Sequence, residues 1–133
     1  MIFLDASVLL AYDNEEDVHH IRAVWIFQEI ERGSFGEPFI SDYIFNEVVG
    51  VTFRKRGRVR ALFIGERLLS SVRIFNIDKA VLAESWKLFS ATPLRLNLVD
   101  CSSIIVATLT KAEYIATFDQ EFKKIKNVKI IAR

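Results

Sequence analysis

The stretch Ile2-Phe3-Leu4-Asp5, followed by Ala6-Ser7-Val8-Leu9-Leu10, decides the fold of this chain. Its first three residues are apolar without alternation, which is typical of a strand buried on both faces, and the strand ends at a carboxylate where a helix begins. In open α/β sheets, ligands bind at the carboxyl ends of the strands, which makes Asp5 the first candidate for chemistry. The alternative interpretation is that Asp5 only caps the helix starting at Ala6.

Strand-like and helix-like segments alternate along the rest of the chain. Beyond the first strand, short strands are predicted at 38–40, 72–77, 114–118 and 128–131. Helices are predicted from Tyr43 to Gly57, onward through Leu69, over about 79–89, and from Asn97, which caps a nearly all-apolar helix. This alternation predicts a mostly parallel sheet between helices, which is an α/β fold.

The apolar positions also predict which helix faces are buried. After an acidic turn at 13–17, these positions are Ile21, Val24, Trp25 and Ile30, and after Gly57 they are Leu62, Phe63, Leu68 and Leu69. The carboxylates of the acidic turn, and His19 and His20 beyond it, are interpreted as surface residues. The aromatic residues Trp25, Phe27, Trp86 and Phe89 are interpreted as core or dimer packing.

Composition limits the class of protein. The chain has 133 residues, 51% apolar and 26% charged, which predicts one globular domain over 1–133. A net charge of +1 does not by itself predict a nucleic-acid partner. The longest uncharged run, 101–110, is too short to span a membrane, and an acid inside the apolar N-terminus argues against a signal peptide. Cys101 is the only cysteine and is expected in the core, and we expect a cytoplasmic protein.

Four acids lie beside apolar sequence instead of in charged loops: Asp5, Glu47, Asp100 and Asp119. Each has a structural explanation, as a helix cap or as a residue at the edge of an apolar stripe. That explanation accounts poorly for the set, because the ends of the first and fourth strands face one edge of a parallel sheet. Asp100 reaches this edge only if its helix begins there. Carboxylates that converge require a cation, and oxygen ligands suit Mg²⁺ or Mn²⁺.

Four segments, in this order and at these intervals, together resemble the PIN-domain ribonucleases, particularly the small VapC-type toxins. They are Phe3-Leu4-Asp5-Ala6-Ser7, Ser41 to Glu47, Leu98-Val99-Asp100 with Ile104-Ile105-Val106-Ala107, and Ile115-Ala116-Thr117-Phe118-Asp119. The resemblance covers nearly the whole chain. It implies a three-layer α/β/α fold with a five-stranded parallel sheet, in which the first strand is central.

The resemblance also implies a function, which is hydrolysis of RNA phosphodiester bonds by a Mg²⁺- or Mn²⁺-dependent endoribonuclease of a toxin–antitoxin pair. By position, Asp5, Glu47, Asp100 and Asp119 would hold one or two ions. Ser7 and Thr117 would orient carboxylates. A cognate antitoxin would block the acidic cleft with a basic side chain, and homodimers are common in the family. Many members carry a further acid after the last motif; here the segment reads Gln120-Glu121-Phe122, and Glu121 is assigned no role.

Alternative interpretations stay open at two points. Five basic residues lie within 54–60, and Arg54, Arg56 and Arg58 are candidates either for RNA binding or for solvated cations at a helix end. The rival function is a non-catalytic PIN-like domain that scaffolds a partner, although a scaffold has no physical need for four acids. A phosphoacceptor domain is disfavoured because Ala6 follows Asp5, and an Asp-x-Asp phosphatase because Ser7 occupies the second position.

Overall fold

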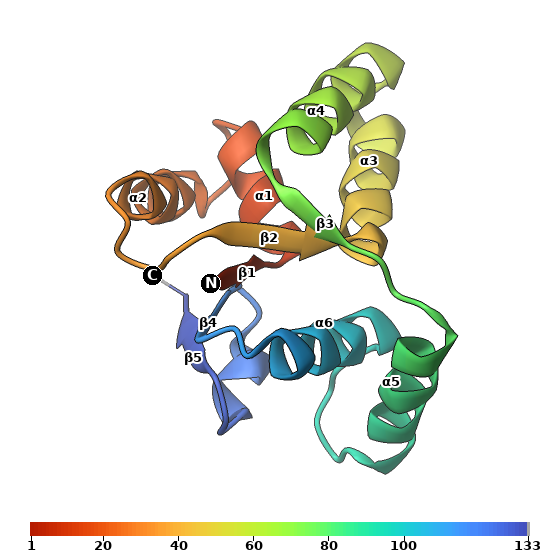
Figure 1. Ribbon diagram of the computed structural model, residues 1–133. Helices are drawn as coiled ribbons and strands as arrows, with labels where there is room; N and C mark the ends of the chain where they lie inside the picture. Colours follow the sequence, from red (N-terminus) through yellow and green to blue (C-terminus); the bar gives the residue numbers. More distant parts are fainter. Residues whose placement is uncertain (133) are drawn as a thin grey trace.

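A five-stranded parallel sheet forms the centre of the computed structural model (Figure 1), which describes residues 1–132. Arg133, the last residue of the predicted domain, lies outside the described residues. The strands follow the spatial order β3-β2-β1-β4-β5, so the first strand is central as predicted. Their bounds are β1 Ile2–Leu4, β2 Pro38–Ser41, β3 Arg73–Phe75, β4 Tyr114–Ala116 and β5 Lys129–Ile131.

Helices cover both faces of this sheet. The first four pack on one face and the next two on the other, which gives the three-layer α/β/α arrangement predicted from the sequence (Figure 1). Their bounds are α1 Ala6–Asp13, α2 His20–Glu31, α3 Asp42–Arg56, α4 Arg58–Ser71, α5 Lys79–Ala91 and α6 Leu98–Thr110, with a 3₁₀ helix η1 at Gln120–Lys124. No helix within residues 1–132 combines the length and the apolar character needed to cross a membrane.

The central strand β1 is fully buried, which explains its uninterrupted apolar sequence. Ile2, Phe3 and Leu4 are 0% exposed, and the Phe3 ring meets Phe39 of β2 edge-on. On the other side, Leu4 pairs with Ala116 of β4, and the backbone N–H of Asp5 donates to the Ala116 carbonyl over 3.0 Å. This pairing places the residue after β1 beside the residues that follow β4.

Local capping sets the ends of the helices near this edge. The Ser41 hydroxyl accepts from the Ile44 N–H at 3.2 Å, as expected for a cap of α3. Asn97 caps α6 in the same way, at 2.8 Å from the Asp100 nitrogen. Gly57 ends α3 with φ of 92° and ψ of 175°, a backbone conformation that only glycine adopts readily.

Several sequence predictions were wrong in detail. The strands are shorter than predicted at 72–77, 114–118 and 128–131. In α2 the predicted apolar face is partly in solvent, because Ile21 is 83% and Trp25 41% exposed, whereas Ala23 and Ile26 face the core. The helix begins only at His20, because Asn14 and Asp17 side chains accept backbone N–H groups and turn the acidic segment separately.

The buried face of α4 also differs from the prediction. Of the four residues predicted on its apolar face, only Leu68 is buried, while Leu62, Phe63 and Leu69 are exposed. Helix α4 instead packs on α3 through small residues, because a Cβ added to Gly65 would lie 3.4 Å from Val49 Cγ2. We refer to this closely packed pair of helices, α3 and α4, as the α3–α4 arm.

Candidate active site

All four predicted acids lie near one another at the carboxyl edge of the sheet. Asp5 follows β1, Asp119 follows β4, Glu47 lies on α3, and Asp100 lies in the first turn of α6. Burial, and then repulsion from Asp5, raises the pKa of the Glu47 carboxyl. Burial, and then the charges of Asp5, Asp119 and Glu47, raises the pKa of Asp100 to about 6. We call these four residues the acidic cluster.

Asp5 is the most enclosed member of the acidic cluster. Its side chain makes no capping hydrogen bond to α1. Instead, the hydroxyls of Ser7 and Thr117 both donate to Asp5 Oδ2, each over 2.8 Å. Asp5 is 7% exposed, and this burial raises its pKa although the two hydroxyl hydrogen bonds act in the opposite direction. The buried Asp5 carboxyl group is thereby fixed in one orientation.

The two hydroxyl residues also join Asp5 to the segment after β4. Ser7 Oγ accepts from the Phe118 N–H at 3.0 Å, and Thr117 Oγ1 accepts from the Asp119 N–H at 3.1 Å. The same Asp119 then accepts, through Oδ1, from the Glu121 N–H at 2.9 Å and so caps η1. One network of hydrogen bonds therefore sets the positions of two members of the acidic cluster.

Asp100 is held by a capping box at the start of α6. Its Oδ2 accepts from the Asn97 N–H at 2.9 Å, while the Asn97 side chain accepts from the Asp100 N–H. The sequence left open whether Asp100 reaches the site edge. In the structure its neighbour Val99, in the first turn of α6, lines one hollow together with Glu47. The capping interpretation of Asp100 is correct, and it does not exclude a role in the acidic cluster.

Within the described part of the chain, no member of the acidic cluster takes part in an ion pair. The ion pairs among residues 1–132 involve other acids: Asp13, Glu29, Glu84 and Glu121. As the side chains are placed there, no three His, Cys, Asp or Glu residues form a ready cage for a metal ion. The donors at this edge are therefore open carboxylate oxygens with excess negative charge, which fits an ion such as Mg²⁺ that keeps several waters and binds through one or two carboxylates.

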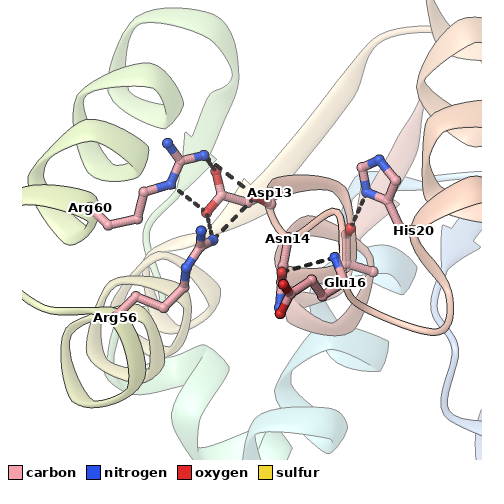
Figure 2. A network of polar contacts seen from close by, with 7 residues as sticks. Asp13, Asn14, Glu16, His20, Arg56 and Arg60 are labelled. Atoms are coloured by element: carbon pink, nitrogen blue, oxygen red, sulfur yellow. Dashed lines mark hydrogen bonds and ion pairs between the residues drawn. The ribbon is translucent and has the colours of Figure 1, made fainter.

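The three candidate arginines of the basic run have different surroundings. Arg54 lines a hollow together with Glu47. Arg58 lies over the Phe53 ring at 4.9 Å from its centroid. Arg56 donates to Asp13 Oδ2 over 3.1 Å, and Arg60 pairs with the same carboxylate, which lies between the two guanidinium groups in Figure 2.

This ion-pair network corrects the prediction that Asp13 lies in solvent, and it is a contact that the sequence analysis missed. Asp13 was expected in solvent, but its side chain is only 7% exposed because Arg56 and Arg60 cover it. Burial and hydrogen bonding at the end of α1 thus tie α1 to the α3–α4 arm. The partners are 43 and 47 residues away, so no local pattern in the sequence could have indicated the contact.

Comparison with known proteins identifies the family. The family model described as PIN domain matches residues 2–128. This chain belongs to the PIN-domain family. Comparison of the sequence with curated proteins gave no match.

The fold of this PIN domain is shared with several solved structures at low sequence identity. VapC20 of Mycobacterium tuberculosis, described as a toxin that cleaves the sarcin–ricin loop, superposes with a TM-score of 0.83 at 20% identity, over 97% of this chain and 99% of that one. VapBC2 of Rickettsia felis, solved bound to a promoter DNA fragment, superposes with a TM-score of 0.71 at 16% identity, over 98% of this chain and 97% of that one. FitAcB of Neisseria gonorrhoeae superposes with a TM-score of 0.70 at 18% identity, over 98% of this chain and 96% of that one. These likenesses agree with the observed α/β/α fold.

Two residues near the acidic cluster of this PIN domain were not singled out from the sequence. Tyr43 and Asn46 line the same hollow as Glu47. On α3, Tyr43 lies one turn before Glu47, and Asn46 directly precedes it. Helical spacing around a candidate acid is the signal that could have found them.

Glu121, which was assigned no role, accepts from the Arg95 N–H at 2.9 Å and so fixes the segment before α6. Cys101 is buried as predicted.

Proposed function

We propose that this PIN domain is a metal-dependent endoribonuclease that hydrolyses RNA phosphodiester bonds, and that it is the toxin of a toxin–antitoxin pair. The observation that carries the proposal is the acidic cluster, in which four carboxylates interact and none forms an ion pair within the described residues. Raised carboxyl pKa values mean that this arrangement costs free energy in the metal-free protein. A non-catalytic scaffold has no reason to maintain that cost, and this disfavours the rival function.

The acidic cluster would hold one or two Mg²⁺ or Mn²⁺ ions, with Asp5 and Asp100 as central ligands. Asp119 would complete one site, and Glu47 would serve a second ion or orient the attacking water. When bound, such an ion lowers the pKa of water and neutralises charge on the phosphate. Ser7 and Thr117 fix the Asp5 carboxylate through Oδ2, so that it does not rotate away from the cluster.

Cleavage of a mixed RNA pool, including tRNA and rRNA fragments, tests the proposal. The pool is incubated with Mg²⁺ or Mn²⁺, or with a chelator, and the parent is compared with Asp100→Asn. Glu113→Gln is the matched control, because this exposed acid precedes β4 at the opposite edge of the sheet. We expect metal-dependent cleavage by the parent and by Glu113→Gln only. Cleavage retained by Asp100→Asn contradicts the site, and a parent that neither cleaves RNA nor binds Mn²⁺ leaves the scaffold as the function.

A cognate antitoxin is the proposed protein partner. Solved relatives of this fold include VapBC assemblies, and this chain has an open apolar groove of about 490 Å³ between α3 and α4. Phe45, Val49, Phe53, Ala61, Leu62 and Leu69 line this groove. An amphipathic segment of the antitoxin would fill it and bring a basic side chain to the acidic cluster. Leu62→Asp with Leu69→Asp should abolish inhibition by the antitoxin and leave cleavage unchanged; inhibition that persists contradicts this location.

A homodimer is the proposed assembly. Leu82, Trp86 and Phe89 are exposed along one side of α5, and the two aromatic rings pack with centroids 5.8 Å apart. Exposed apolar residues that cluster in this way are typical of protein interfaces. Sedimentation of the parent and of Trp86→Lys tests this: we expect a dimer that the substitution dissociates, and a monomeric parent would contradict it.

A further inference from the structure

A polar hollow of about 400 Å³ adjoins the acidic cluster on one flank of α3. Tyr43, Asn46, Glu47, Gly50 and Arg54 line it from α3, and Val99 closes it from α6 beside Asp100. The α3 residues recur at intervals of three and four, which places them along one side of the helix. We call this feature the α3 hollow. Because Glu47 belongs to both features, the α3 hollow is continuous with the candidate active site.

Arg54 supplies an uncompensated positive charge in the α3 hollow. A Cβ added to Gly50 would lie 3.4 Å from Arg54 Nη1, so the guanidinium lies over Gly50, one turn before Arg54 on α3. Within residues 1–132, Arg54 takes part in no ion pair, whereas Arg56 is paired with Asp13 and Arg58 lies over Phe53. Of the three candidate arginines in the basic run, the structure therefore singles out Arg54.

The geometry points to a subsite for single-stranded RNA in the α3 hollow, and this inference rests on the proposed ribonuclease function. Arg54 would bind a phosphate next to the one that is cleaved, while Tyr43 would stack on a base and Asn46 would hydrogen-bond to a base edge. Arg54 lies eleven positions after Tyr43, which is about 16.5 Å along the helix axis. This distance is longer than a single phosphate group, so the α3 hollow is long enough to contact several linked nucleotides.

Two other surfaces are alternatives to the α3 hollow as the RNA-binding face. The groove between α3 and α4 shares Gly50 with the α3 hollow but is otherwise lined mostly by apolar side chains, which suits a protein better than a polyanion. A larger hollow between α2 and η1 contains Arg22, Trp25 and Lys123, but no member of the acidic cluster lines it. Only the α3 hollow, among these three, combines a cation with a residue of the candidate active site. Arg22 therefore provides a matched control for Arg54.

Binding can be measured separately from cleavage. A short randomised single-stranded RNA with a fluorescent label is titrated with the Asp100→Asn chain, and anisotropy is followed over a range of salt concentrations. Adding Arg54→Ala should weaken binding about tenfold and reduce the salt slope by about 0.7, the share of one phosphate contact. Arg54→Lys should retain the slope. Arg22→Ala and Arg58→Ala should each change affinity by less than about twofold.

Two further variants separate binding from a structural role. Gly50→Ala should strengthen α3, because alanine favours the helix, and should leave RNA binding unchanged, because its Cβ would be in ordinary contact, at 3.4 Å, with the flexible end of Arg54. Tyr43→Leu should lower affinity by about fivefold or more through loss of stacking. A structural role alone would make stability and binding change together.

The outcomes distinguish this subsite from the proposed function. Charge and stacking tolerate any sequence, so a chain that binds no randomised RNA overturns the subsite. Unchanged affinity in Arg54→Ala also overturns it, and leaves the α3 hollow to a protein partner. In either case, metal-dependent cleavage by the parent would leave the proposed function in place, whereas loss of cleavage in the parent itself would count against the function.

Discussion

Thr117 Oγ1 lies 2.8 Å from Asp5 Oδ2, across 112 residues of sequence. This hydrogen bond joins the end of the central strand β1 to the segment that follows its neighbour β4. Because Ser7 donates to the same oxygen, the carboxylate of Asp5 is held by groups from two directions. The orientation of the most buried acid in the site therefore depends on two hydroxyl groups.

Removing the Thr117 hydroxyl should reduce RNA cleavage strongly while the protein still folds. Thr117→Val retains the shape of the side chain but leaves Asp5 Oδ2 with one hydroxyl donor and the Asp119 N–H without its acceptor. We expect a loss of about 1–2 kcal/mol in the free energy of unfolding and about 10- to 100-fold in RNA cleavage. Urea denaturation and initial cleavage rates measure the two effects.

Thr110→Val is the control for this substitution, because its hydroxyl donates to the Val106 carbonyl within α6. It should leave cleavage unchanged. If Thr117→Val also cleaves RNA at the parental rate, the hydroxyl does not position Asp5.

The pH dependence of stability should reveal the burial and charge at Asp100. Its pKa is raised from 3.8 to about 6, so the folded protein binds this proton more tightly than the unfolded chain does. The resulting stability is present below about pH 4 and is lost as the pH rises through about 6. Relative to Asp100→Asn, the metal-free parent should lose roughly 1–2 kcal/mol over this interval, a figure reduced for partial exposure.

Urea denaturation with a chelator at a series of pH values measures this difference, with Glu113→Gln as a control that should follow the parent. A parent and an Asp100→Asn variant with parallel pH profiles would contradict the assigned environment. Mn²⁺ should raise the stability of the parent at neutral pH, because an ion that binds only the folded state stabilises it.

Breaking the Asp13 network should loosen the α3–α4 arm. In Asp13→Asn the side chain keeps its size but loses the charge that faces Arg56 and Arg60. We expect a loss of about 1–2 kcal/mol, since the carboxylate is covered while both arginines are partly exposed. Hydrogen exchange should increase in α3 and α4 more than in α5 and α6.

The exposed Glu84–Lys87 pair on α5 provides the comparison. Glu84→Gln should change the free energy of unfolding by less than about 0.5 kcal/mol. Equal effects at the two sites would mean that Asp13 is no more important than a surface ion pair.

Gly57 should not tolerate a side chain, although nothing fills the space beside it. A Cβ at this position meets no atom within 4 Å, but φ of 92° with ψ of 175° is strained for any other residue. Gly57→Ala should therefore cost about 1–3 kcal/mol. Gly50→Ala, within the regular part of α3, should be neutral or stabilising; a neutral Gly57→Ala would contradict the backbone argument.

The sequence predicted the sheet and the acidic cluster because both depend on local patterns. The uninterrupted apolar run Ile2–Leu4 indicated a strand buried on both faces, and Asn97 indicated where α6 begins. The acids were found because each stands beside an apolar segment. Resemblance to the family then supplied their roles, which stay predictions.

The remaining features depend on tertiary contacts that leave no local pattern. Trp25 and Ile21 fit an apolar helix face, but smaller Ala23 and the neighbouring Ile26 face the sheet instead. Leu62 and Leu69 also fit such a face, but close packing at Gly65 rotates α4 so that they line an open groove. The rotation of a helix about its axis is set by the fit of its neighbours, which one sequence does not encode locally.

The central position of β1 has a consequence for the order in which this protein matures. Strand β1 (Ile2–Leu4) is translated well before one of its two pairing partners, β4 (Tyr114–Ala116). A nascent chain that has not yet reached Thr117 and Asp119 leaves one side of β1 without a neighbour and lacks half of the contacts that fix Asp5. The proposed ribonuclease would therefore gain the fixed orientation of Asp5 only after β4 and Thr117 have been made.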